Sequence, residues 1–508
     1  MKLAAIDIGT NSIHMIIVEA TGRHSFEVID REKEMVKLGA GVFASKRLSD
    51  RAFAEGLETI RRYVQLADQR GVDEIITAAT SAIREARNGG AFLDEVVRQT
   101  GISPQVISGG KEARLIFQAV RNAIALQGEK ALVLDIGGGS TEVVLGDEEE
   151  IYFAKSLKLG VLRLLDMFEK PGPVGAEARG VLEAHIRFLA QDALQEARKI
   201  GFSRVIGTSG TIRSMGEAAH LAGGGQPLRS VNAEIVQLKN ITEVTGELLE
   251  LSPEKRTKID AVNEKRADAI HLGGVLLNQL MQLAGVKEIT LCEASLREGL
   301  VLDYLERHGH NIDNLPPARD LRHRSVAQLA LKYNVDWEQA SHVADLALQL
   351  FDQTKDLHHL GDYERDILEY AALLHGIGKY ISFQRYHKNS RYIIKHAGLR
   401  GLNDEEILLI GHVARYHRKA RPKKRHGKFK KLSKGQRRVV RILSGMLRLA
   451  VNLDRTKNQL VRQIECEVSN GALELQLSGA GRFELEVWAA KQQRRPLARA
   501  LGKKIKIK

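Results

Sequence analysis

A short motif that occurs twice constrains this chain more than any other feature of its sequence. Residues 3–17 read LAAIDIGTNSIHMII, and residues 131–145 read ALVLDIGGGSTEVVL. Each copy consists of an apolar run, Asp-Ile-Gly, a small polar turn that ends in Ser, and a second apolar run. Short apolar runs on both sides of a glycine turn are typical of a β-hairpin. Two matched hairpins in one chain predict two related lobes with a cleft between them.

The turns of the two hairpins carry residue types that bind phosphate. Glycine lets backbone N–H groups approach anionic oxygens without obstruction by a Cβ atom. Hydroxyl groups add donors, and the Asp at the end of each first strand is a hard oxygen ligand suited to Mg²⁺ beside a phosphate. A single turn of this kind is more often a structural hairpin with an Asx-type bond, but a matched pair favours function. The matched positions are Asp7 with Asp135, Gly9 with Gly137, and Ser12 with Ser140.

Both turns resemble the phosphate loops of the actin-like ATPase superfamily. Three further segments resemble one branch of it, the exopolyphosphatase / guanosine pentaphosphate phosphohydrolase (Ppx/GppA) family: ATSAIREARNG at 79–89, VISGGKEARLIF at 106–117 and IGTSGTIRSM at 206–215. RADAIHLGG at 266–274 and SLREGL at 295–300 also resemble it. The resemblance implies an α/β fold with two actin-like (ribonuclease H-like) lobes. It also implies a hydrolase that acts on phosphoric anhydride bonds.

The resemblance implies a role for each matching residue. Glu112 would be the catalytic base that activates water, and Arg84 would contact the phosphate being removed. Asp7, Asp135 and Glu142 would help to hold Mg²⁺. This chain has Lys111-Glu112 where the family often carries two adjacent glutamates. The residues that would bind phosphate are Gly9, Thr10, Asn11 and Ser12 in the first turn and Gly137, Gly138, Gly139 and Ser140 in the second.

The residue pattern around these positions agrees with those roles. Ser108-Gly109-Gly110 ends a predicted strand, and the apolar spacing that follows predicts a helix with Glu112 in its first turn. A Glu there could simply favour the helix dipole, whereas phosphoryl hydrolysis requires a group that orients and deprotonates water. Arg84 follows the predicted strand IITAAT, and an Arg guanidinium matches phosphate geometry, although an exposed Arg is often only a solvated charge. Glu142 shares a strand face with Ser140 by alternation, but it could also be an ordinary strand charge.

The second half of the chain follows a predicted linker near 308–320 and is helical in pattern. It resembles the HD metal-phosphohydrolase fold, in which His342, His375 and Asp454 match the expected positions. Gly376 stands where the Asp of the His-Asp pair is expected, so a metal centre would lose a carboxylate ligand. We therefore predict an all-α, degenerate HD-like domain without catalysis.

Strand-like runs from about Leu460, namely IECEVSN, ALELQLSG and FELEVWAA, predict a small α+β C-terminal piece. The predicted domains are actin-like lobe I at 1–124, actin-like lobe II at 125–307, the HD-like domain at 321–457 and the C-terminal piece at 458–508.

The net charge of +14 and the pI of about 9.6 favour polyanionic partners. The densest basic run, at 418–438, is either a solvated loop or a guide for a polyanion. Phe429 is its only aromatic residue, so stacking on bases is poorly served, and polyphosphate is favoured over nucleic acid.

The predicted function is Mg²⁺-dependent exopolyphosphatase activity, the removal of terminal phosphate from inorganic polyphosphate. The alternative of the same chemistry is a guanosine pentaphosphate 5'-phosphohydrolase, and the alternative of another class is a non-catalytic polyphosphate or nucleotide sensor. Glu112, Asp135 and Glu142 together argue against the sensor. With two cysteines, no signal-peptide pattern and no apolar run near roughly 20 residues, the chain is expected in the cytoplasm without a membrane span. A homodimer is implied by the resemblance.

Overall fold

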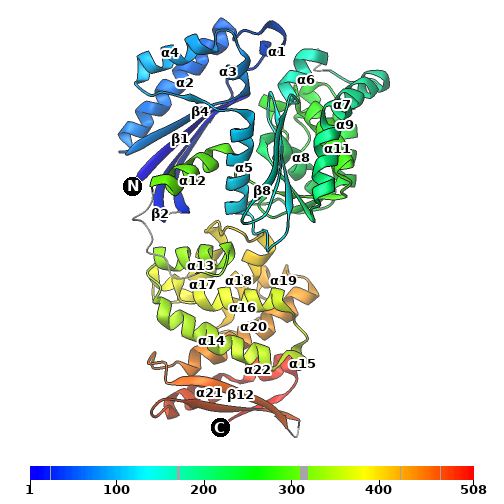
Figure 1. Ribbon diagram of the computed structural model, residues 1–508. Coiled ribbons are helices and arrows are strands. Elements are labelled where there is room, and N and C mark those ends of the chain that lie inside the picture. Colours follow the sequence, from blue (N-terminus) through cyan, green and yellow to red (C-terminus); the bar gives the residue numbers. More distant parts are fainter. Residues whose placement is uncertain (23, 169–171, 309–317, 424, 470) are drawn as a thin grey trace. The chain divides into compact units, whose positions relative to one another are not determined.

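The chain forms two compact units in the computed structural model, Met1–Asn314 and Leu315–Lys508 (Figure 1). The structure describes residues 1–22, 24–168, 172–308, 318–423, 425–469 and 471–508. Most of the predicted linker near 308–320 therefore lies outside the described residues. Within the described residues, no helix has the length and apolar character needed to cross a membrane.

The first lobe is built on a five-stranded sheet of order β3-β2-β1-β4-β5. β1 pairs antiparallel with β2 and parallel with β4. Alternate residues of β1 enter different cores, because successive side chains of a strand point to opposite faces. Leu3 and Ala5 lie in one core and Ile6 and Ile8 in the other. The strands are β1 (Lys2–Ile8), β2 (Ile13–Gly22), β3 (Ser25–Glu34), β4 (Glu74–Ala79) and β5 (Gln105–Val106).

Helices cover both faces of this sheet. α2 (Asp50–Gln69) and α4 (Gly89–Thr100) pack on the core that contains Ile6 and Ile8. α5 (Gly109–Ala123) and α12 (Leu296–His308) pack on the opposite face. α12 follows the second lobe in sequence, and the predicted ranges place it there, but it contacts β1, β2 and α5 of the first lobe.

The second lobe repeats this topology on a six-stranded sheet of order β10-β11-β9-β6-β7-β8. β6 pairs antiparallel with β7 and parallel with β9, as β1 does with β2 and β4. Both predicted hairpins are therefore confirmed, and so are the two related lobes. The strands are β6 (Ala131–Ile136), β7 (Thr141–Gly146), β8 (Ile151–Leu157), β9 (Arg204–Thr208), β10 (Ile235–Gln237) and β11 (Glu288–Leu291). The main helices are α6 (Val161–Phe168), α7 (Ala176–Ile200), α8 (Ser209–Ala222), α9 (Leu238–Glu250) and α11 (Ile270–Ala284).

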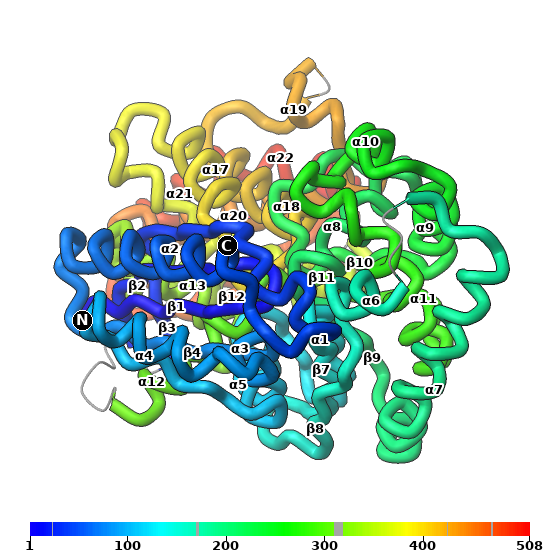
Figure 2. The backbone as a smooth tube through the Cα atoms, turned by 90° about the horizontal axis from the view of Figure 1, so that it is seen from above, coloured from blue at the N-terminus to red at the C-terminus, as the bar shows by residue number. Residues whose placement is uncertain are grey.

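The second unit is the predicted helical domain with its small sheet (Figure 2). A single apolar core runs through the helices and continues into the strands. Its longer helices are α13 (Leu321–Lys332), α14 (Trp337–Gln353), α16 (Asp362–Leu374), α17 (Tyr386–His396), α18 (Asp404–Tyr416) and α20 (Lys434–Leu453).

The C-terminal piece is α+β, as predicted, but one of its predicted strands is wrong. Its sheet has the order β12-β13-β14, formed by Val461–Ser469, Ala472–Gly479 and Lys504–Ile507. The run FELEVWAA instead lies in helix α21 (Glu484–Gln493). Its alternation of apolar residues is too short to separate strand from helix, and tertiary packing decides in favour of a helix that buries Glu486.

Two glutamines of α14 cover the free edge of β12. Gln349 donates through Nε2 to Arg462 O at 3.1 Å and accepts from Ile464 N at 2.8 Å. Gln353 donates to Ile464 O at 2.6 Å and accepts from Cys466 N at 2.9 Å. Edge strands expose unpaired backbone groups that invite pairing with other chains. Here the two side-chain amides bond the backbone N–H and C=O groups that a neighbouring strand would otherwise bond.

Candidate active site

The same backbone hydrogen bond closes both hairpin turns. Gly9 N donates to Ser12 O at 3.2 Å, and Gly137 N donates to Ser140 O at 2.9 Å. A Cβ atom at Gly9 would lie 2.7 Å from Ser12 O, which is too close for any side chain. The closure of the first turn therefore requires Gly9, whereas a Cβ atom on Gly137 would lie 3.1 Å from Ser140 O, a tight contact.

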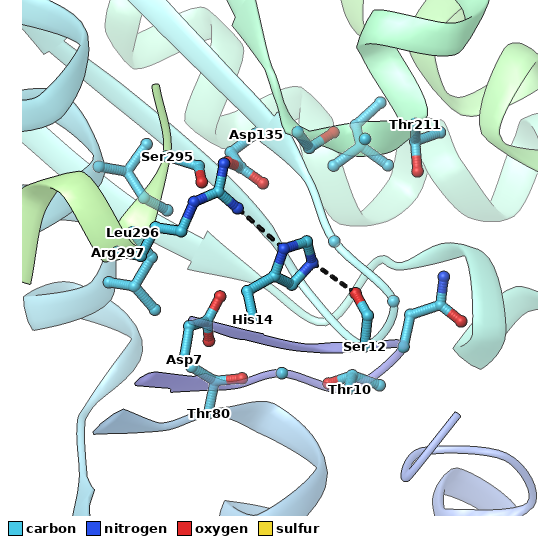
Figure 3. A pocket seen from close by; sticks show the side chains of 18 of the residues that line it. Asp7, Thr10, Ser12, His14, Thr80, Asp135, Thr211, Ser295, Leu296 and Arg297 are labelled. Carbon is cyan, nitrogen blue, oxygen red and sulfur yellow. Dashed lines mark hydrogen bonds between the residues drawn. The ribbon is translucent and has the colours of Figure 1, made fainter. Parts of the chain in front are cut away.

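The two turns face each other across the cleft between the lobes. A Cβ atom on Gly138 would lie 3.0 Å from Thr10 Cγ2 and 3.3 Å from Asn11 Cβ, so the turns are in close contact. Beside them lies a cavity of about 370 Å³ (Figure 3). Of the predicted site residues, the cavity is lined by Asp7, Gly9, Thr10, Asn11, Ser12, Glu112, Asp135, Gly137, Gly138, Gly139, Ser140 and Glu142.

Glu112 enters the cavity from the first turn of α5, as the sequence predicted. Ser108 caps this helix by accepting a hydrogen bond from Lys111 N at 3.2 Å. Glu112 is 7% exposed, and its Oε2 lies 3.4 Å from Nη1 of Arg84. The same nitrogen of Arg84 donates to Ile107 O at 2.6 Å. Arg84 thus stands behind Glu112 and is not among the residues that line the cavity.

Four carboxyl groups lie close together in the cavity wall, of which Glu112, Asp135 and Glu142 are buried and Asp7 is partly buried. Burial raises the pKa of Glu112 well above its usual range, and nearby Glu142 raises it further, while Arg84 opposes both. Burial likewise raises the pKa of Asp7 to about 7 and that of Asp135 well above its usual range. Charged carboxylates in this position are therefore costly unless a cation is close to them.

The oxygen atoms around these carboxyl groups fit a hard metal ion. Oδ1 of Asp7 and Oδ1 of Asn11 are buried and have no hydrogen-bond partner among the described residues. Mg²⁺ is commonly held by one or two carboxylates together with phosphate oxygens and water. No group of three His, Cys, Asp or Glu in the described part of the chain could hold a metal ion alone. The observation that fits a metal ion is therefore the pair of unpartnered oxygens of Asp7 and Asn11.

Cationic side chains also line the cavity wall. Lys33, Arg213, Arg266 and Arg297 all line it. Burial and the neighbouring Arg266 and Arg213 lower the pKa of Lys33 to about 8. Nε of Arg213 is buried without a hydrogen-bond partner in the described residues. A Cβ atom on Gly210 would lie 2.0 Å from Nη2 of Arg266, so this glycine makes room for the guanidinium. Arg297 forms an ion pair with Glu298 at 3.1 Å. The cavity wall thus carries both carboxylates and cations.

His14 lines the cavity and was missed by the sequence analysis. It pairs with Asp7 in the β1–β2 register, as Glu142 pairs with Asp135 in the β6–β7 register. The internal repeat could have identified it, because aligning Asp7 with Asp135 also aligns His14 with Glu142. Arg297 was also missed, although it lies in the quoted segment SLREGL.

The HD-like residues are not assembled into a comparable site. His342 lines a groove on α14. His375 hydrogen-bonds Ala372 O through Nδ1 at 2.6 Å, and Asp454 accepts from Nε2 of Gln339 at 3.2 Å. Each side chain thus has its own local surroundings. That this domain works without a metal ion stays a prediction.

The basic run at 418–438 presents many exposed cations, including Lys419, Arg421, Arg425, Lys428, Lys430, Lys431 and Lys434. Phe429 is fully buried and packs against the rings of His412 and Tyr416. The single aromatic residue of the run therefore anchors it to the helical core and is not available for stacking on a base.

Comparison with known proteins places the chain among phosphatases. Residues 16–308 match the Ppx/GppA phosphatase family, and residues 321–497 match domain III of Ppx/GppA phosphatases. A guanosine-5'-triphosphate,3'-diphosphate pyrophosphatase of Aeromonas hydrophila is 30% identical over 409 residues, which are 80% of this chain and 79% of the relative. An exopolyphosphatase structure from Cytophaga hutchinsonii has a TM-score of 0.57 at 25% identity, covering 60% of this chain and 98% of that one. A Ppx/GppA family member from Aquifex aeolicus has a TM-score of 0.52 at 25% identity, with coverage of 61% and 99%.

Proposed function

This chain belongs to the Ppx/GppA phosphatase family, a family of phosphoanhydride hydrolases, and we propose that it removes terminal phosphate from inorganic polyphosphate. The observation that carries the proposal is the cavity itself. Carboxylates and cationic side chains line its wall, with two glycine turns between the lobes. Such a wall complements a chain of phosphates, because carboxylates suit a metal ion and water, and cations suit anionic oxygens.

Glu112 is the proposed base for water. A carboxyl group whose pKa is raised above its usual range by burial accepts a proton better than an ordinary Glu does. Its carboxylate takes the proton from water as the water oxygen bonds to the terminal phosphorus. The bridging P–O bond breaks, and the shortened chain leaves with that oxygen. Arg84, at 3.4 Å, favours the ionised state that Glu112 needs.

Asp7, Asp135 and Glu142 are the proposed holders of Mg²⁺. When bound, the ion would supply positive charge that neutralises phosphate oxygens. Arg84 was predicted to contact the departing phosphate, and in this proposal it acts through Glu112 while phosphate oxygens meet the two turns. Their hydroxyl and backbone donors lie on both sides of the cleft.

The basic run supports polyphosphate as the substrate, since a long polyanion can follow an array of exposed lysines and arginines. The second candidate substrate is guanosine pentaphosphate, which the Aeromonas hydrophila relative supports by its name. A pure sensor would not need Glu112, Asp135 and Glu142 together. We expect a homodimer from the family resemblance and a cytoplasmic location from the low cysteine content. Sedimentation and cell fractionation test these two points.

The test is phosphate release, with Mg²⁺, from long-chain polyphosphate and from guanosine pentaphosphate, side by side. Wild type should turn over polyphosphate faster, and Glu112→Gln should lose this activity. Glu196→Gln is the matched control, because Glu196 is exposed and pairs with Lys155 on the surface. Preference for the nucleotide would reassign the substrate, and release from neither would support the sensor.

A further inference from the structure

Three side chains form a hydrogen-bonded row along the cavity wall (Figure 3). Nη1 of Arg297 lies 2.9 Å from Nδ1 of His14. Nε2 of the same imidazole lies 2.7 Å from Oγ of Ser12. Arg297 comes from the start of α12, whereas Ser12 and His14 belong to the first hairpin. All three line the cavity.

The direction of these hydrogen bonds follows from the chemistry of arginine. A guanidinium has donors and no acceptor, so it donates to Nδ1, which must carry the lone pair. The proton of a neutral imidazole then resides on Nε2, and Nε2–H donates to Oγ of Ser12. Burial and the neighbouring Arg297 lower the pKa of His14 well below its usual range, in agreement with a neutral ring.

The hydroxyl of Ser12 is therefore an acceptor toward His14 and keeps its own hydrogen for another partner. In the second hairpin the polarity is reversed. Glu142 is an acceptor at the position of His14, and its pKa is raised to about 7 by burial against the opposing hydrogen bonds of Ser156 and Ser140. The Ser140 hydroxyl thus donates to a carboxylate, while the Ser12 hydroxyl is free to donate to an anion in the cavity.

We propose that His14 is a positioning residue that holds the Ser12 hydroxyl as a donor to a phosphate oxygen of the substrate, with Arg297 fixing its tautomer. The inference rests on the proposed function for the identity of the substrate. A hydroxyl that already accepts a hydrogen bond is a stronger donor, because hydrogen bonds in a chain polarise one another. The Ser12 hydroxyl thus binds phosphate, whereas the Ser140 hydroxyl supports the carboxylate cluster and leaves the backbone N–H groups of its turn to meet phosphate.

Two substitutions at His14 separate its two hydrogen bonds. His14→Asn places an amide near the position of Nδ1, so it can still accept from Arg297 but does not reach Ser12. His14→Gln places an amide N–H near the position of Nε2, so it can still donate to Ser12. His220→Asn is the control, because His220 bonds Gln226 O and Glu234 and is not among the residues that line the cavity.

The measurements are calorimetric binding of inorganic pyrophosphate and kcat/KM on long-chain polyphosphate. His14→Asn should weaken both about tenfold, the order of one lost hydrogen bond to a charged group. His14→Gln should recover most of the loss. In a Ser12→Ala background, His14→Asn should cause no further loss. A melting temperature close to that of wild type confirms that each variant is folded.

The positioning role of His14 would be overturned if His14→Asn caused the same loss in the Ser12→Ala background as in wild type. It would also be overturned if His14→Gln bound and turned over substrate as weakly as His14→Asn. Wild-type behaviour of His14→Asn, or no pyrophosphate binding by wild type, would also overturn it. If wild type binds pyrophosphate but hydrolyses neither polyphosphate nor guanosine pentaphosphate, the proposed function fails. The binding comparison then still decides the role of His14.

Discussion

Arg84 holds Glu112 from behind: its Nη1 lies 3.4 Å from Oε2 of Glu112 and 2.6 Å from the carbonyl oxygen of Ile107. One nitrogen thus links the carboxylate to the end of the strand that precedes α5. The guanidinium opposes the rise in the pKa of Glu112 that burial and Glu142 cause. Its positive charge therefore favours the ionised state of the proposed base.

The first prediction concerns the acid side of the pH–activity profile. Glu112 must be ionised to accept a proton, and its pKa lies above that of an ordinary Glu. The value of kcat/KM should therefore rise with pH up to a plateau above this raised pKa. In Arg84→Met the rising limb should move to higher pH, because the opposing positive charge is gone. A limb that stays in place in Arg84→Met would contradict the role of Arg84.

The second prediction concerns stability without metal. Burial raises the pKa of Asp7 to about 7 in the folded state. The raised pKa of Asp7 stabilises the fold at pH values below the pKa of the same group in the unfolded chain. This stabilisation is lost as the pH rises through about 7. In the presence of EDTA at pH 8, the melting temperature of Asp7→Asn should therefore be about 5 °C higher than that of wild type. At pH 4 this difference should be much smaller. Mg²⁺ should raise the melting temperature of wild type at pH 8 and have a smaller effect on Asp7→Asn. Equal melting temperatures for both proteins at pH 8 would contradict it.

A third prediction concerns the covered edge of β12. Gln353→Leu removes the amide that bonds Ile464 O and Cys466 N. The amide hydrogen of Cys466 should exchange faster, and the helical unit should lose about 1–3 kcal/mol of stability, because the backbone groups lose their partners. Gln476→Leu, an exposed position on β13, is the control. Unchanged hydrogen exchange at Cys466 would show that the Gln353 side chain does not protect the edge of β12.

The fourth prediction tests the basic run. Charge reversal at Lys428, Lys430 and Lys431 should raise KM for long-chain polyphosphate about tenfold at low salt, with little change at high salt, because exposed charges are screened. KM for guanosine pentaphosphate should change little. The control reverses Lys239, Lys255 and Lys258, which are exposed and carry the same total charge. An equal effect in the control would mean that net charge alone matters.

Local patterns in the sequence correctly predicted much of the fold. Both hairpins, the Ser108 turn and the helix with Glu112 in its first turn form as predicted, since they depend on residues within a few positions of one another. The run FELEVWAA failed for the opposite reason. Its alternation is short, and burial of Glu486, which accepts from Thr456 Oγ1 at 2.7 Å, depends on a segment 30 residues away.

The sequence by itself therefore determined the two glycine turns, their carboxylates and the family to which the chain belongs. Only the tertiary structure decided that Arg297 lies beside His14, although 283 positions separate them. It also decided that Phe429 is an anchor, and that the carboxylates and cations line one cavity. The physical reason is that a turn is fixed by local backbone geometry. The charge and tautomer of a buried group are instead set by whichever side chains the packing of distant segments brings to it.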